Sequence, residues 1–102
     1  QTLPLMASGV DGVISVAANV APQLMKALTG AVSASDLKEA IRLNNSLTPL
    51  YHACFAESNP IPVKAALSLM GLCSDEMRLP LLPASVGTRE LLSGVLHGLG
   101  LL

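Results

Sequence analysis

Charged residues are scarce in this sequence. Only 13% of the 102 residues are charged and 51% are apolar, whereas about a quarter of a soluble domain is usually charged. The six basic and seven acidic residues are scattered along the chain, so that no cationic surface for nucleic acid is predicted. The length suits one small domain. With so little charge, we expect much of its apolar surface to contact other protein.

Long hydrophobic runs are absent as well. The two longest charge-free stretches, residues 12–25 and 43–56, are fourteen residues each and are interrupted by Asn, Pro or Gln. A membrane-spanning helix needs about 18–20 mainly apolar residues. The first ten residues carry no charge, unlike the basic start of a secretory signal peptide. The sequence therefore predicts no membrane partner, and we expect a cytoplasmic protein.

Residues that form disulfides or bind metals are few. Cys54 and Cys73 are predicted to be reduced thiols, because Cys54 has the spacing of a core residue and nothing indicates an oxidising compartment. His52 and His97 are far apart in the sequence and have no Cys or carboxylate at ligand spacing, which argues against zinc. We predict no metal and no cofactor.

One short segment has the pattern of a β-strand. Residues 12–16, GVISV, are a β-branched run between small or polar residues, which predicts a strand buried on both faces. Before it, Leu3, Met6 and Ala7 have helical spacing, and Gly9 is placed to end that helix in the left-handed conformation. A buried strand needs neighbours at both edges, but no second convincing strand is present.

The remainder of the sequence predicts helices. Asn19 is expected to cap a helix that has Pro22 in its first turn and ends at Gly30. Ser33 or Ser35 is expected to open a longer helix whose apolar residues share one broad face.

Proline and glycine residues predict where the later helices bend, begin or end. Pro49 lies within the long helix, where we expect a kink or break near residues 46–48. A short helix over 62–69 is followed by Gly71 and by a loop that is extended around its prolines. The last helix is predicted from Ser85–Thr88 to about His97.

The predicted fold class is mainly α, with one short buried strand and four to five helices. A helix, a strand and a helix in this order are typical of a repeating α/β fold with parallel strands. One strand cannot make such a sheet, and the sequence begins with Gln1 rather than Met. We therefore expect the other strands to lie upstream of Gln1.

Several blocks in a fixed order resemble one enzyme family. They are "DGVISVAANVAPQLMKAL", "LTPLYHACFAESNPIPVKAALSLMGL", "RLPLLPAS" and the closing "GLGLL". In this order they resemble the C-terminal portion of the dihydrodipicolinate synthase family over about Leu3 to Leu102. The resemblance implies a C-terminal fragment of a (β/α)8 TIM barrel with a helical extension, from a parent that is usually a homotetramer. Residues 1–32 would be the end of helix 7, strand 8 and helix 8 of the barrel, and residues 33–102 the extension.

The resemblance also implies a chemistry. The family condenses pyruvate with aspartate semialdehyde in lysine and diaminopimelate biosynthesis, through a Schiff base between pyruvate and an active-site lysine. That lysine and its partners are expected upstream, so that this chain would hold no catalytic residue and would be inactive alone. Its one expected contribution is Ile14, on the wall of the pyruvate pocket.

Two alternatives to this interpretation stay open. One is another pyruvate-dependent aldolase, such as an N-acetylneuraminate lyase or a keto-deoxy sugar acid aldolase. The other is a helical interaction module without catalysis.

Lys64 is the alternative candidate for a Schiff-base lysine, since a neutral amine can attack a carbonyl. Pro60 and Pro62 explain the segment more simply, because they lack the N–H that a first helical turn leaves unused. We therefore expect Lys64 to point outward or to pair with an acid such as Glu57.

Overall fold

The computed structural model describes residues 1–102 and is built from five α-helices, one 3-10 turn and no β-strand. It divides into an N-terminal unit, Gln1–Thr48, and a C-terminal unit, Pro49–Leu102. The mainly helical fold class agrees with the prediction from the sequence, apart from the strand.

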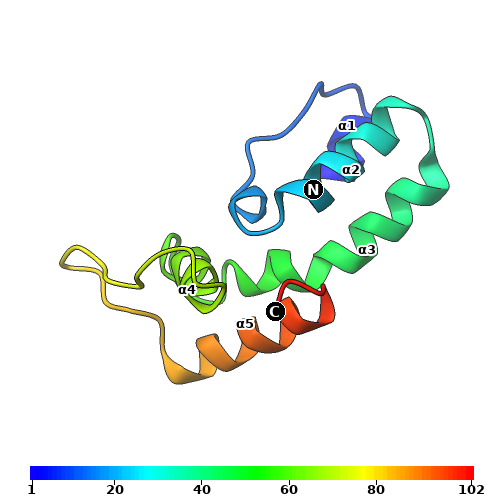
Figure 1. Cartoon of the computed structure of the whole chain (residues 1–102). Coiled ribbons are helices and arrows are strands. Elements are labelled where there is room, and N and C mark those ends of the chain that lie inside the picture. Colours follow the sequence, from blue (N-terminus) through cyan, green and yellow to red (C-terminus); the bar gives the residue numbers. More distant parts are fainter. The chain divides into compact units, whose positions relative to one another are not determined.

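The N-terminal unit is formed around α2. Its elements are α1 (Thr2–Ala7), η1 (Ala17–Asn19), α2 (Pro22–Ser33) and the first part of α3 (Leu37–Ala53). Both α1 and η1 pack on α2, and Figure 1 shows α1 beside it. The buried apolar side chains of this unit include Met6, Val20, Met25, Leu28, Ala40, Leu43 and Leu47.

The end of α1 has the predicted form. Gly9 has φ +107°, in the region that favours glycine. The Gly9 amide donates to the Met6 carbonyl at 3.0 Å, and the Val10 amide donates to the Leu5 carbonyl at 3.2 Å. These bonds satisfy carbonyls that the helix end would otherwise leave unpaired.

The predicted bounds of α2 are wrong at both ends. Pro22 is indeed its first residue, but Asn19 lies in η1, where its side-chain amide donates to the Val16 carbonyl at 3.1 Å. Gly30 lies inside the helix, which continues to Ser33. The cost of an internal glycine is only about 1 kcal/mol, and the left-handed turn after the helix falls on Ser35, with φ +59°.

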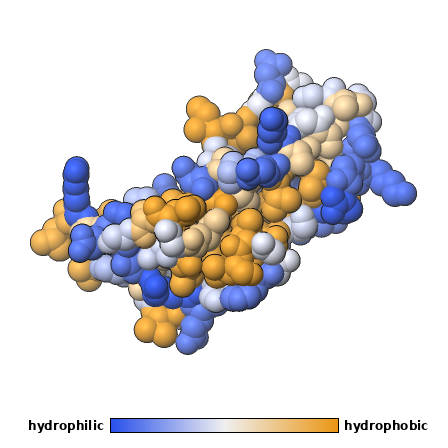
Figure 2. Space-filling view, in the orientation of Figure 1, coloured by the Kyte–Doolittle hydropathy of each residue, from blue (hydrophilic) through white to orange (hydrophobic).

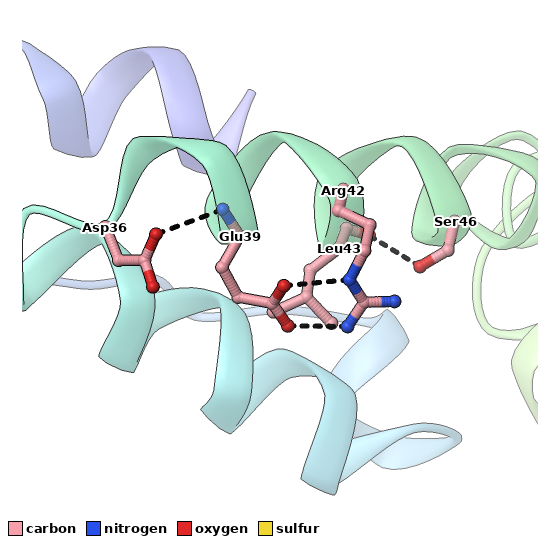
Figure 3. A network of polar contacts seen from close by, with 5 residues as sticks. All are labelled: Asp36, Glu39, Arg42, Leu43 and Ser46. Carbon is pink, nitrogen blue, oxygen red and sulfur yellow. Dashed lines mark hydrogen bonds and ion pairs between the residues drawn. The ribbon is translucent and has the colours of Figure 1, made fainter.

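The long helix α3 differs from its prediction in two ways. Asp36, and not a serine, opens it, because the Asp36 carboxylate accepts a hydrogen bond from the Glu39 amide at 3.2 Å (Figure 3). The helix also continues through Pro49 without a break. An internal proline costs about 3 kcal/mol, and the burial of Leu47 and Leu50 on this helix offsets that cost.

The C-terminal unit is formed by the end of α3, by α4 (Ile61–Leu69) and by α5 (Val86–Gly98). In this unit α4 and α5 pack on each other (Figure 1). Its buried apolar side chains include Leu50, Cys54, Val63, Ala65, Ala66, Leu92 and Leu96. Both new helices begin and end close to their predicted positions.

The local signals of α4 and α5 explain their bounds. Pro60 precedes α4 and Pro62 lies in its first turn, as predicted, and Gly71 after it has φ +76°. The Ser85 hydroxyl caps α5 by accepting from the Thr88 amide at 3.2 Å. The proline and serine signals were therefore sufficient to locate these helix starts.

The predicted buried strand at residues 12–16 is not present. Residues 11–15 are neither helix nor strand, and residues 10–14 are all exposed. A strand requires hydrogen bonds to a neighbour, and the chain offers no second strand to supply them.

Candidate functional site

The segment around Ile14 is held at both ends and open in its middle. At one end the Val10 amide is bonded to α1. At the other, the Ser15 hydroxyl accepts from the Ala18 amide at 3.2 Å, at the start of η1. Between them Ile14 has a relative exposure of 106%, and Val13 is also exposed. The structure thus presents the predicted site residue as an uncovered apolar side chain.

The chemistry available near Ile14 in the sequence is limited. Asp11 is the one charged side chain among residues 1–25. An isoleucine can shape a pocket and exclude water, but it cannot act as a nucleophile, an acid or a base. Any role of Ile14 in a reaction therefore depends on reactive groups supplied from elsewhere.

A surface hollow of about 340 Å³ lies in the N-terminal unit. Its lining is apolar except for one serine and consists of Leu3, Met6, Ala7, Val32, Ser35, Leu37 and Ala40. Without an ionisable side chain, this lining offers neither acid–base nor nucleophilic chemistry.

Lys64 lies on α4 and holds the loop that follows this helix. Its Nζ donates to the backbone carbonyl of Glu76. Of the two expectations for Lys64, that it points outward or pairs with an acid such as Glu57, the pairing is not observed: Lys64 makes this exposed contact with Glu76, and Glu57 binds Ser85 instead. The side chain that could have been a Schiff-base lysine therefore has a structural contact in this unit.

Glu57 accepts hydrogen bonds at the start of α5. Its carboxylate is 3.0 Å from the Ser85 amide and 3.2 Å from the Ser85 hydroxyl. Hydrogen bonds from Thr88 and from the Ser85 amide lower the pKa of Glu57 below its ordinary value. The sequence did not predict this contact, since the two partners are 28 positions apart and no local signal links them.

The remaining candidate side chains do not form a cluster. Cys54 and Cys73 are free thiols, the first buried and the second exposed. Burial raises the pKa of Cys54 to about 11, which disfavours its reactive thiolate form. The Nδ1 of His97 is 2.8 Å from the Ser93 carbonyl. No group of three or more His, Cys, Asp or Glu side chains is close enough to hold a metal ion.

Two ion pairs join charged side chains outside the segment around Ile14. On α3, Arg42 forms a bidentate pair with Glu39 at 2.8 and 2.5 Å (Figure 3). This pair lowers the pKa of Glu39 and is exposed. In the C-terminal unit, Asp75 and Arg89 lie 2.5 Å apart and each side chain is 34% exposed.

Membrane crossing is not supported by any helix of the structure, since none is both long and apolar enough to cross a bilayer.

Comparisons with known proteins give a consistent result. The model of the dihydrodipicolinate synthetase family matches residues 1–98. The 4-hydroxy-tetrahydrodipicolinate synthase of Thermotoga neapolitana is 52% identical over all 102 residues, which are 35% of that protein. The one of Geobacter sulfurreducens is 52% identical over 95 residues, 93% of this chain and 33% of that protein.

A solved structure is similar over nearly the whole chain. The dihydrodipicolinate synthase of Thermotoga maritima has 50% sequence identity and a TM-score of 0.97, over 99% of this chain and 34% of that one. The chain therefore spans about a third of the length of the relatives that it matches.

Proposed function

The chain belongs to the dihydrodipicolinate synthetase family, and we propose that it is the C-terminal third of a 4-hydroxy-tetrahydrodipicolinate synthase. The observation that carries the proposal is the identity of about half of its residues, over its whole length, with relatives of that name. The proposed reaction condenses pyruvate with aspartate semialdehyde. A lysine in the preceding two thirds of the enzyme forms the Schiff base, because a neutral amine is the nucleophile that this step needs.

In this proposal the two parts of the chain have different tasks. Residues 1–32 supply the last strand and helix of the barrel, and residues 33–102 form the helical extension. The exposure of Ile14 supports the task of the first part, because an apolar side chain in open solvent is available to line a pocket when the barrel is complete. The complete enzyme is proposed to be a cytoplasmic homotetramer that needs no cofactor.

The two alternatives have weaker support. Another pyruvate-dependent aldolase would share the barrel and the Schiff base, but relatives that are about half identical to this chain carry the synthase name. A non-catalytic helical module would not require the segment around Ile14 at all.

A chimeric enzyme tests the proposal. Residues 1–102 replace the matching third of the Thermotoga neapolitana synthase, and the formation of product from pyruvate and aspartate semialdehyde is measured. We expect activity close to that of the parent. Ile14→Asp should lower kcat/KM by about a hundredfold through a misshapen pocket, while Ile14→Val, as matched control, should keep most of the activity. A folded chimera without activity would contradict the proposal.

The isolated chain tests where the reactive lysine lies. Borohydride reduction of a mixture of pyruvate and the 102-residue chain traps any Schiff base as a stable adduct. We expect no adduct on the isolated chain and one adduct on the chimera. An adduct on Lys64 would place the chemistry in this chain and overturn the assignment.

A further inference from the structure

The loop between α4 and α5 carries apolar side chains that are directed outward. Leu79 is 83% exposed and Leu82 is 64% exposed, and Leu72 and Val86 at the two ends of the loop are exposed as well. Figure 2 shows hydrophobic surface over this loop and at the start of α5. We call these four side chains the loop surface.

The loop itself is held in place by polar contacts. Lys64 binds the Glu76 carbonyl, and Arg89 pairs with Asp75 at 2.5 Å. The Leu81 amide donates to the Arg78 carbonyl at 3.1 Å, across a turn. Two polar contacts thus hold the loop to α4 and α5, while Leu79 and Leu82 remain exposed to solvent. Exposed apolar side chains that are grouped on an ordered segment mark an interaction surface.

We propose that the loop surface is a docking site for the part of the polypeptide that precedes residue 1 in full-length members of the family. This inference rests on the proposed function, because it requires that the chain be the C-terminal third of a longer enzyme. Leu79 and Leu82 are the central contacts.

The length of the relatives supports this occupant. About two thirds of their polypeptide lies outside the part that this chain matches. The chain, with its loop, also has the backbone arrangement of the Thermotoga maritima enzyme, in which that remaining polypeptide is present. A surface that already has its bound conformation loses little conformational entropy when it is covered.

The size of the loop surface argues against a second copy as the occupant. A stable dimer interface buries about 800 Å² on each partner and involves about 20–30 residues a side. Four side chains on one loop fall well short of that number. A contact within one polypeptide can be this small, because it does not pay for the association of two molecules.

The test compares the same variants in two settings. Leu79→Asp with Leu82→Asp is introduced into the isolated chain and into the chimera, and thermal unfolding is followed by circular dichroism. We expect no change in the isolated chain and a decrease in Tm of about 5 °C or more in the chimera. Leu79→Met with Leu82→Met is the control and should leave both unchanged, since it keeps volume and hydrophobicity.

Two results would overturn the inference. One is an equal effect of the aspartate pair in both settings, including no effect in either. The other is a loss of assembly, measured by light scattering, with an unchanged Tm, because this would make the loop surface an interface between copies.

A second measurement does not depend on activity. Leu79→Cys is alkylated with iodoacetamide and the reaction at residue 79 is followed by mass spectrometry. We expect alkylation at least about tenfold slower in the chimera than in the isolated chain, and equal rates would count against docking. Failure of the proposed function would be recognised by a different result, an unsubstituted chimera that folds but has no activity.

Discussion

Both units of the chain have side-chain hydrogen bonds between close neighbours in the sequence, but the C-terminal unit adds several between distant residues. In the N-terminal unit, Ser15, Thr29 and Ser46 each bond to a residue three or four positions away. In the C-terminal unit, the partners of Lys64, Arg89 and Glu57 lie 12, 14 and 28 positions away. The first set shapes individual turns, whereas the second fastens separate segments to one another.

This difference indicates how far each unit depends on further polypeptide. The C-terminal unit contains the partners for its own loop and helix start. The N-terminal unit leaves the segment around Ile14 exposed and without a strand partner. Within the proposed function, the C-terminal unit lies wholly in the extension, residues 33–102, whereas residues 1–32 of the N-terminal unit supply a strand and a helix to a barrel that other residues complete.

Removal of a buried side chain from the C-terminal unit should have the largest effect. Leu92 is fully buried on α5, and Leu92→Ala is expected to lower the free energy of unfolding by about 2–5 kcal/mol through lost burial and a cavity. Urea unfolding of the isolated chain, followed by circular dichroism, measures this change.

The neighbouring residue supplies the control for Leu92. Leu91 is exposed, and Leu91→Ala should change the free energy of unfolding by no more than about 0.5 kcal/mol. Equal effects of the two substitutions would mean that the C-terminal unit does not form its own core in solution.

Loss of the cap of α5 should have the next largest effect. Ser85→Ala removes the acceptor of the Thr88 amide and a donor to Glu57, which should cost about 1 kcal/mol. Ser93→Ala, within the same helix, should be neutral or slightly stabilising, because alanine is the better helix former. If Ser93→Ala were the more costly of the two, the cap would not be what fastens α5.

Local chemistry made much of the fold predictable from the sequence. The starts of α4 and α5 follow from Pro60, Pro62 and Ser85, and the end of α1 follows from Gly9. Each of these signals acts within one helical turn, so that the neighbouring residues suffice to predict its effect.

The errors at Asn19, Gly30 and the start of α3 concern local signals, but most of what the sequence did not predict depends on distant groups. The continuation of α3 through Pro49 depends on buried packing, and the pairing of Asp75 with Arg89 spans a loop. The strand at residues 12–16 requires neighbours that the chain does not contain. Ile14 was identified through a family resemblance alone, since an isoleucine in an apolar run carries no chemical signal of its own.

The energy of the ion pair between Asp75 and Arg89 in the C-terminal unit can be measured with a double-mutant cycle. Asp75→Asn, Arg89→Gln and the double variant are compared by urea unfolding. Because both side chains are about one-third exposed, we expect a coupling energy of only about 0.5–1 kcal/mol. The same cycle on Glu39 and Arg42, which are more exposed and three residues apart, should give a smaller coupling, because solvent screens an exposed pair more strongly. A larger coupling on α3 would reverse the comparison between the units.

Acid should weaken the C-terminal unit through Glu57, with the smallest of the expected effects. The pKa of Glu57 in the folded chain is lowered from its ordinary value of 4.5, so that the unfolded chain takes up the proton first as the pH falls. Its contribution to stability is therefore complete above pH 4.5 and is lost as the pH falls through the lower, folded value. Glu57→Gln should flatten the pH dependence of Tm in this range, which thermal unfolding at a series of pH values measures. If Glu57→Gln left the acid limb unchanged, Glu57 would not fasten the end of α3 to the start of α5 in solution. Two long-range side-chain contacts of this unit would then remain, Lys64 with Glu76 and Arg89 with Asp75, and both hold the loop between α4 and α5.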